Sequence, residues 1–207
     1  DVQTGGRETY PVNINGNWNL SGGASWWKRF GHFSLRLDMS GNHSNRVGMI
    51  NEDKSLQPEK STTRDTGLNC EAQASYQPSW GGIDLSTSWN YQYSLNSLND
   101  NDTYTRYYNF GLNGYVDFPF GLQLRTDATY NLRSGTNIQK GEDDEILWNA
   151  GATWRFLKKK EAELSAYWAD ILGKKKSYRR MATSDGFYEY RTQEIKGYFI
   201  VTFKYNF

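Results

Sequence analysis

The chain of 207 residues carries 24 lysine and arginine residues against 23 aspartate and glutamate residues, which gives a formal net charge of +1. This balance argues against nucleic acid as a partner, because polyanions are attracted by a strongly basic surface. A single cysteine, Cys70, excludes a disulfide within the chain, and two histidines leave little material for a metal site. No stretch approaches the roughly 20 apolar residues of a membrane helix.

Aromatic residues narrow the class of fold. The chain contains 8 Trp, 15 Tyr and 10 Phe residues, although its mean hydropathy is −0.83. Disordered chains are poor in aromatic residues, so this composition argues against disorder. A polar average with many aromatics is typical of a transmembrane β-barrel, in which only alternate residues meet lipid. A soluble β-sandwich and a carbohydrate-binding sheet share this composition, so composition alone leaves these classes open.

Alternation of apolar and polar residues predicts nine strands. In the first of them, Val12, Ile14 and Trp18 share one face, while Asn13 and Asn15 share the other. Residues two positions apart in a strand lie on the same face of a sheet. The predicted strands cover residues 11–26, 33–40, 68–76, 83–93, 108–117, 122–132, 146–156, 162–169 and 198–207.

Charged residues respect this alternation in every predicted strand. None of them falls on an apolar face, which is the face expected to meet lipid. The opposite face carries Arg36, Asp38, Glu71, Asp84, Asp117, Arg125, Asp127, Arg155, Glu163 and Lys204. Six of these charges are expected to form a polar network in a water-filled interior, with a substrate path or a plug contact as the alternative: Arg36, Asp38, Glu71, Arg125, Asp127 and Arg155.

The connections between the predicted strands alternate in length. The short ones lie at 28–32, 78–82, 118–121 and 157–160, and the long ones at 46–65, 94–106, 133–145 and 173–194. Outer-membrane barrels alternate tight periplasmic turns with long external loops, whereas a Greek-key sandwich has no reason to do so. The fold class we predict is therefore all-β, a transmembrane antiparallel β-barrel with nine strands in this chain.

Aromatic residues cluster beside the short connections, where the membrane–water interface on the periplasmic side is expected. A girdle of aromatic side chains is typical of that interface. The residues concerned are Trp26, Trp27, Phe30, Trp80, Phe118, Phe120 and Phe156.

Three segments carry a family resemblance: "YPVNINGNWNLSG" (10–22), "ILWNAGATWRFLKKKEAELSAYWADIL" (146–172) and "KGYFIVTFKYNF" (196–207). With them, nearly all of the chain resembles the C-terminal barrel of the Bacteroidota outer-membrane β-barrel family, relatives of TonB-dependent receptors. The resemblance implies a receptor with a plug inside a barrel of about 22 strands, energised through TonB. No plug domain and no second domain has a counterpart in residues 1–207.

Strand direction suggests a part of a larger barrel. If the last strand runs towards the periplasm, the strand at 11–26 runs the same way, and two such strands cannot pair as antiparallel neighbours. Bacterial single-chain barrels have an even number of strands. We therefore expect residues 1–207 to be the C-terminal portion of a longer outer-membrane barrel.

The last predicted strand resembles the assembly signal of outer-membrane barrels, with an aromatic end and apolar residues at alternate positions. We expect the barrel-assembly machinery to recognise it by edge pairing. The residues of this predicted signal are Phe199, Val201, Phe203, Tyr205 and Phe207.

The sequence predicts no enzyme, no metal site and no cofactor. His32 and His43 are separated by about 36 Å of strand, so they do not share a catalytic site. No glycine-rich phosphate loop, CxxC motif or paired-carboxylate signature is present. One predicted external loop carries a basic cluster, which consists of Lys174, Lys175, Lys176, Arg179 and Arg180. Two interpretations are open: the cluster contacts a ligand, a partner or lipopolysaccharide phosphates, or it belongs to a solvated loop.

Together these features place the protein in the cell outer membrane. The function implied by the resemblance is import of a nutrient or metal complex by a TonB-dependent receptor-like barrel. Two alternatives remain: a structural or assembly-partner barrel without transport, and a soluble carbohydrate-binding β-sheet protein. The expected partners are outer-membrane lipids and lipopolysaccharide, the barrel-assembly machinery, and TonB through parts absent from this chain, with no nucleic acid.

Overall fold

The computed structural model describes residues 13–50, 59–98, 102–136, 138, 144–157, 161–175, 178–183, 186–191 and 195–206. Within these ranges the secondary structure consists of strands and the turns that join them. No helix in these ranges is long and apolar enough to cross a membrane.

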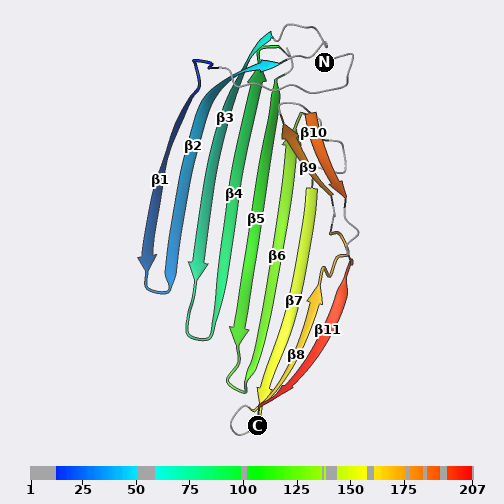
Figure 1. The fold of residues 1–207 in the computed structure, drawn as a ribbon. Coiled ribbons are helices and arrows are strands. Elements are labelled where there is room, and N and C mark those ends of the chain that lie inside the picture. Colours follow the sequence, from blue (N-terminus) through cyan, green and yellow to red (C-terminus); the bar gives the residue numbers. More distant parts are fainter. Residues whose placement is uncertain are drawn as a thin grey trace.

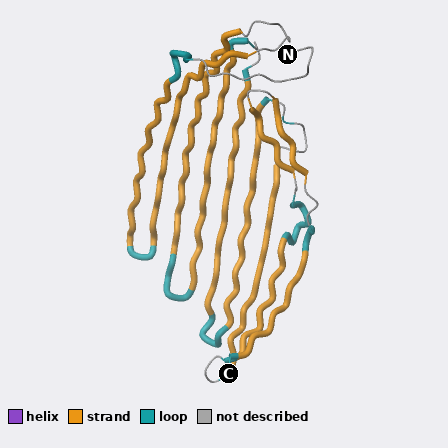
Figure 2. Tube along the Cα trace, viewed as in Figure 1, coloured by secondary structure: helices purple, strands orange, loops and turns teal. Residues whose placement is uncertain are grey.

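Nine of the strands form one antiparallel sheet in the order β1-β2-β3-β4-β5-β6-β7-β8-β11 (Figures 1 and 2). β9 and β10 pair with each other as a separate two-stranded sheet. The strands are β1 (Trp18–Phe30), β2 (Phe33–Ile50), β3 (Glu59–Tyr76), β4 (Gly81–Asn96), β5 (Thr103–Asp117), β6 (Leu122–Gly135), β7 (Asp144–Phe156), β8 (Ala162–Ala169), β9 (Tyr178–Thr183), β10 (Gly186–Arg191) and β11 (Tyr198–Tyr205).

The nine-stranded sheet confirms that nine strands form one antiparallel sheet, but several of them begin or end at other residues than predicted. The first strand begins at Trp18 instead of residue 11 and continues to Phe30. Residues 13–17 are not in a strand, and residues 11 and 12 lie outside the described ranges. At this end the chain is bonded through side chains instead, because Asn45 donates from Nδ2 to the Gly16 carbonyl at 2.8 Å and the Val47 amide donates to Asn17 Oδ1 at 2.6 Å.

The predicted long loops were wrong in extent, because strands run far into them. β2 continues to Ile50 and β3 begins at Glu59, so most of the predicted loop 46–65 is paired strand. β4 and β5 likewise enter the predicted loop 94–106, β6 and β7 enter 133–145, and 173–194 contains the β9–β10 hairpin. Alternation of apolar and polar residues marks only the part of a strand that has a lipid face, whereas backbone pairing continues wherever a neighbouring strand is present.

Strand length also indicates that the strands extend beyond the region that faces lipid. About 9–11 residues are enough for a tilted strand to cross a bilayer, and β2 and β3 have 18 residues each. Their upper ends in Figure 1 therefore extend well past the band in which apolar residues alternate. β8 and β11, with 8 residues each, are much shorter.

The short connections lie together at the lower end of the sheet in Figure 2. Gly121 shows how tight they are: it adopts a φ of +88°, and a Cβ there would collide with the carbonyl oxygen of Arg155. Glycine tolerates both conditions because it has no Cβ. Its amide donates to Phe118 O at 3.1 Å, which closes the turn between β5 and β6.

The two edges of the sheet are β1 and β11, which run in the same direction because an even number of antiparallel steps separates them. Among the described strands, each of the two is paired on one side only. The sheet is thus an open wall, and no second sheet packs face to face against it within the described ranges.

Adjacent residues of β5 provide a test of the two faces. Leu112 lies on the apolar face near the middle of the apolar band, and Asn113 points to the polar face opposite Asp84 and Asp127. We expect Leu112→Arg to destabilise the folded protein by about 2–4 kcal/mol, because a guanidinium at the bilayer midplane loses its hydration. Asn113→Arg should cost much less, since two carboxylates face that position.

The measurement is reversible urea unfolding of both variants and the parent in phosphatidylcholine vesicles, followed by tryptophan fluorescence. Similar losses for Leu112→Arg and Asn113→Arg would contradict the assignment of the two faces.

Candidate functional site

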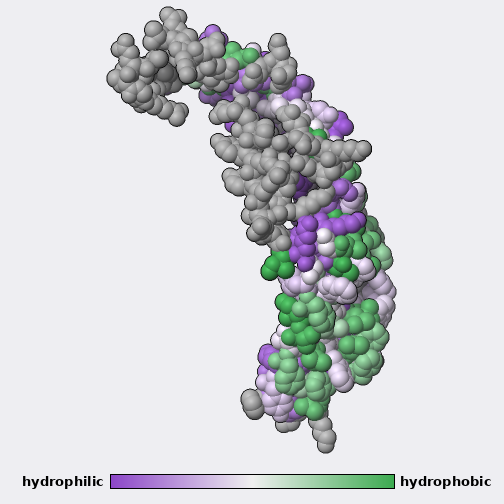
Figure 3. Space-filling view, turned by 90° about the vertical axis from the view of Figure 1, so that its right-hand side faces the viewer, coloured by the Kyte–Doolittle hydropathy of each residue, from purple (hydrophilic) through white to green (hydrophobic). Residues whose placement is uncertain are grey.

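The apolar face of the sheet has no protein partner among the described residues. Large side chains along it are exposed, with Leu20 at 69% and Phe203 at 63% of their accessible surface. The buried apolar residues are limited, in the part of the chain described, to Ala162 and Ala169. A surface this apolar needs a hydrophobic environment to cover it. Figure 3 shows hydrophobic residues gathered over the lower half of the β8–β11 side, below a polar region.

Aromatic side chains border this apolar face. Beside the short connections, ring centroids of Phe118 and Phe120 lie 5.5 Å apart, and those of Trp154 and Phe156 lie 4.8 Å apart. At the opposite border the Trp18 ring contacts His43 at 5.2 Å. Three residues of the predicted aromatic girdle, Phe118, Phe120 and Phe156, thus take part in ring contacts beside the short connections.

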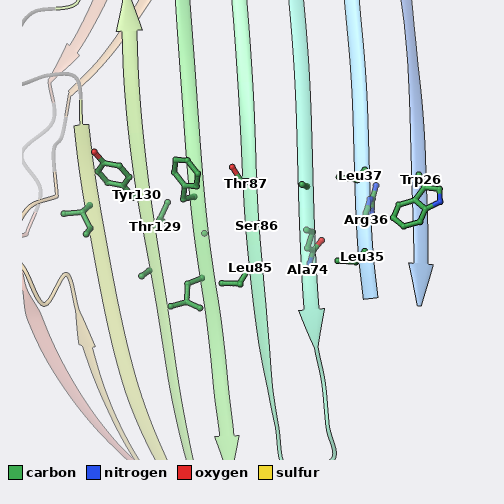
Figure 4. A pocket seen from close by; sticks show the side chains of 17 residues that line it. Trp26, Leu35, Arg36, Leu37, Ala74, Leu85, Ser86, Thr87, Thr129 and Tyr130 are labelled. Atoms are coloured by element: carbon green, nitrogen blue, oxygen red, sulfur yellow. The ribbon is translucent and has the colours of Figure 1, made fainter. Parts of the chain in front are cut away.

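A shallow apolar hollow of about 600 Å³ runs across β1 to β7 on this face (Figure 4). Small side chains such as Ala72, Ala74 and Ala128 form its floor, and larger ones such as Trp26 and Tyr130 flank it. Because its surface is almost wholly apolar and continuous with the exposed face, it fits hydrocarbon chains and lacks polar groups that would orient a specific ligand.

The polar face is linked across the strands by side-chain hydrogen bonds. Ser25 donates to Asp38 at 2.7 Å between β1 and β2, and Asn90 donates to Asn69 at 2.8 Å between β4 and β3. In both pairs the two residues face each other directly in the register. Direct cross-strand pairs are the strongest side-chain contribution to a sheet.

The same pattern continues on β5 to β8. Asn131 accepts from Asn109 at 2.6 Å and from the Tyr107 hydroxyl at 2.8 Å. Asn149 donates to Asp127 at 2.6 Å, and Arg155 forms an ion pair with Glu163 at 2.8 Å.

Three further members of the predicted network also have partners. Arg36 pairs with Asp38, Glu71 accepts from Asn69 at 3.2 Å, and Arg125 lies 5.2 Å from the Tyr167 ring centroid. These contacts confirm the predicted network.

The polar face also holds a concave region at the outer ends of β1 to β5, which we call the outer basin. Its volume is about 730 Å³. At its centre, Asp65 accepts from Arg46 Nη2 at 2.6 Å and from Ser94 Oγ at 2.7 Å. The residues that line the outer basin are Asn17, Trp18, Asn19, Asn42, Ser44, Asn45, Arg46, Asp65, Thr66, Gly67, Gln92, Tyr93, Ser94, Thr103 and Thr105.

Three amides in the outer basin are available for binding. The side chains of Asn19, Asn42 and Gln92 form no hydrogen bond with any described residue, and all three belong to the polar face. Primary amides both donate and accept, so they suit ligands rich in hydroxyl, carbonyl or amide groups. Sequence reasoning missed this basin, because it assigned much of β2 and β3 at this level to a loop.

Comparison with known protein families matches residues 60–205 to the outer membrane protein beta-barrel family. This match spans β3 to β11 and covers more than two thirds of the chain. The chain belongs to the outer membrane protein beta-barrel family. No curated protein and no solved structure matches it.

Membership of this family places the protein in the outer membrane. The apolar face is thus the lipid-facing side of a barrel wall and the polar face is its luminal side. The short connections lie at the periplasmic end, and the outer basin opens towards the cell exterior. A soluble carbohydrate-binding sheet, one of the two alternatives from the sequence, is excluded by this assignment.

The predicted external basic cluster is only partly described. Lys174 and Lys175 follow β8, and their backbone amides donate to the two carboxylate oxygens of Asp170 at 3.0 and 3.1 Å. Arg179 and Arg180 lie on β9, where their backbones pair with β10 and their side chains are not described. Lys176 lies outside the described residues. The described residues therefore do not test whether these five side chains form a site, and the basic cluster stays a prediction.

Asp170 organises the start of this external segment. It is 4% exposed and adopts a φ of +45°, and its own amide donates to Asn149 Oδ1 at 2.7 Å. Gly197, just before β11, is adjacent to it, with a φ of +52°. One carboxylate thus fixes the direction in which the chain leaves the barrel wall. Sequence patterns gave no signal for it.

Of the predicted assembly signal, four residues lie on β11 and Phe207 lies outside the described residues. Phe199, Val201 and Phe203 are all more than half exposed on the lipid-facing side. They pair in register with β8, for example Phe203 with Leu164.

His32 lies in the turn before β2, and His43 lies within β2, eleven residues further along the chain. His32 hydrogen-bonds to the Gln77 carbonyl at 3.1 Å, and His43 hydrogen-bonds to Thr66 at 2.8 Å. Within the described residues no group of three or more His, Cys, Asp or Glu side chains is arranged to hold a metal ion.

The role of Asp170 is testable. We expect Asp170→Ala to accelerate backbone hydrogen exchange at residues 171–175 about 5- to 30-fold, because two amides lose a charged acceptor and alanine tolerates the positive φ poorly. Asp84→Ala is the matched control, since the Asp84 side chain forms no hydrogen bond with a described residue. Unchanged exchange at residues 171–175 in Asp170→Ala would show that the carboxylate does not hold this segment.

Proposed function

We propose that this barrel belongs to a receptor-type transporter that imports a nutrient or metal complex across the outer membrane and is energised through TonB by parts outside this chain. The observation that carries the proposal is the outer basin, a concave polar region on the luminal side at the external end. A solute that approaches from outside meets this region before the rest of the lumen.

The chemistry of the outer basin supports capture of a polar solute. Its amides and hydroxyls outnumber its charges, and the one ion pair within it, Arg46 with Asp65, is internally neutral. A neutral site with many hydrogen-bond groups recognises a ligand by geometry, since each ligand hydroxyl or carbonyl needs a matched partner once water is displaced. The resemblance of the sequence to relatives of TonB-dependent receptors supports active import, because the barrel itself supplies no energy.

A structural barrel without transport is the alternative. The cross-strand bonds of the luminal face favour it in part, because they stabilise a wall whether or not a solute passes. The two functions differ in their effect on growth, since loss of an importer limits growth only on its own nutrient.

Growth experiments test import. We expect a deletion strain to lose growth on one or a few compounds of a defined nutrient panel, and the parent strain to lose the same growth when TonB is depleted. Ser94→Trp should reproduce the defect because it fills the outer basin beside Asp65. Leu95→Trp is the matched control, as its side chain is on the lipid-facing side of the same strand.

Normal growth of the deletion strain on the whole panel, together with a weakened envelope, would instead identify a structural barrel.

We also propose that the barrel-assembly machinery recognises β11. This strand is paired with β8 on one side, and no described strand pairs with its other side, where addition of a partner strand is the expected mode of recognition. Lipid-facing rings along it add side-chain contacts that a neighbouring strand or lipid can cover.

Loss of β11 side chains should affect insertion more than stability. We expect Tyr205→Ser with Phe207→Ser to reduce the amount inserted in cells several-fold, because an unfolded strand is recognised chiefly by its end residues. The same protein refolded in detergent should keep most of its heat resistance, as removal of two interfacial rings costs about 1–3 kcal/mol each.

The control is Leu164→Ser on β8, which removes a lipid-facing side chain from the strand next to β11. Equal losses of insertion and of heat resistance in the double variant would contradict recognition and leave these rings as lipid-facing structure only.

A further inference from the structure

Arg106 is a charged residue on the lipid-facing side of the wall. It belongs to β5, where Tyr108, Phe110 and Leu112 follow on the same face. Its guanidinium carbon lies 5.4 Å from the ring centroid of Tyr104 and 5.9 Å from that of Tyr91, its register partner on β4. Two tyrosine rings therefore hold the cation by cation–π interaction.

This arrangement leaves the hydrogen-bonding edge of the guanidinium available. A ring packs against the flat face of the group, whereas its five N–H donors point outwards in the plane. Arg106 is exposed and forms no ion pair with any carboxylate in the described ranges. The nearby Asp102 accepts from the Tyr93 hydroxyl at 3.0 Å.

Two more cations share this face further out. Arg64 and Lys60 occupy positions of β3 that belong to its lipid-facing side. Both are exposed, and neither forms an ion pair or side-chain hydrogen bond with a described residue. In the register, Arg64 is opposite Leu95 on β4, which lies four residues further out along that strand than Tyr91, the partner of Arg106. The outer ends of β3 and β5 thus present a positive strip towards the membrane, which we call the basic strip.

The height of the basic strip identifies its surroundings. Val116 ends the apolar face of β5 beside the periplasmic turn, and ten residues separate it from Arg106. At about 3.4 Å per residue and a tilt of about 40°, this distance spans about 26 Å across the membrane. The apolar band of an outer-membrane barrel is about 25 Å tall. Arg106 therefore lies where the hydrocarbon of the outer leaflet meets its headgroups.

We propose that Arg106 binds a phosphate group of the phosphorylated glycolipid that forms the outer leaflet, and that Arg64 and Lys60, which lie further out on the same face, add positive charge along the path of that lipid. An arginine fixed by aromatic rings is suited to bidentate contact with a phosphate. Because the rings already order its side chain, binding costs little further conformational entropy. The ligand is a lipid and not a soluble anion, because the basic strip faces outwards from the barrel at the end of the apolar band. The proposal is independent of transport.

The luminal side supplies a matched control. Arg133 lies 5.5 Å from the ring centroid of Tyr107, its register partner, at almost the same height as Arg106 but on the opposite face. Substitution of either arginine removes one stacked guanidinium. Only Arg106→Gln removes it from the side that contacts lipid.

The experiment is a titration of the purified protein, in zwitterionic detergent, with bisphosphorylated lipid A, followed by native mass spectrometry. We expect Arg106→Gln to weaken lipid A binding about tenfold, which corresponds to about 1.4 kcal/mol. Arg133→Gln should bind as the parent does, and Arg106→Lys should lie between, because lysine keeps the charge without bidentate geometry. Heat-dependent migration in gels checks that each variant is folded.

Three results would overturn the proposal. The first is unchanged lipid A binding by folded Arg106→Gln, and the second is equal binding of dephosphorylated lipid A. The third is displacement of lipid A by inorganic phosphate at matched concentration, which would identify a soluble anion site. If Arg106→Gln does not fold, Tyr104→Leu replaces it, with an expected loss of about threefold because the cation is kept but no longer held in place.

Discussion

A backbone amide or carbonyl inside hydrocarbon has no water to bond with, and every other feature of this protein follows from that condition. Lipid-exposed irregular backbone is excluded, so a chain without membrane helices must pair strand with strand. The register from β1 to β11 does this without interruption, because each strand of the large sheet is paired with its neighbour in the chain or, for β8, with β11. Once the ladder is complete, the side chains on its two sides are free to differ.

That freedom explains why the described residues build no core in the usual sense. Its apolar side chains are directed into lipid, and its polar ones are joined across strands by pairs such as Asn69 with Asn90 and Arg155 with Glu163. The hydrophobic partner that a soluble domain builds from its own residues is supplied here by the bilayer. Stability is therefore a property of the protein together with its amphipathic surroundings, and the luminal pairs add cross-strand specificity.

Sequence alternation predicted the wall well where lipid enforces it. Between Phe33 and Met39, for instance, an apolar residue at every second position has a single physical cause. Outside the hydrocarbon that cause disappears, and polar stretches such as 59–66 are indistinguishable from a loop although they are paired strand. The same limit hid the outer basin and the basic strip, since both depend on which polar residues share a face.

Individual site residues were harder to predict. The stacking of Arg106 depends on register, which places Tyr91 opposite it, whereas the sequence pattern assigned Arg106 to the loop 94–106. Asp170 depends on a positive φ and on amides four and five residues later, a local geometry with no periodic signal. A site defined by one residue type at a regular spacing along the chain can be predicted from the sequence. A site defined by which residues of neighbouring strands lie opposite each other cannot, because the register is not visible in the sequence.

The shared direction of β1 and β11 restricts how a complete barrel is assembled from this wall. Rotation about the membrane normal leaves the direction of every strand unchanged. In a ring of identical copies around that axis, β1 of one copy would therefore lie beside β11 of the next copy as a parallel neighbour. A parallel seam breaks the antiparallel up-and-down order that such barrels keep. Ring symmetry among identical copies is therefore an unsuitable route to closure. An antiparallel cylinder that includes this sheet needs an odd number of additional strands between its two edges.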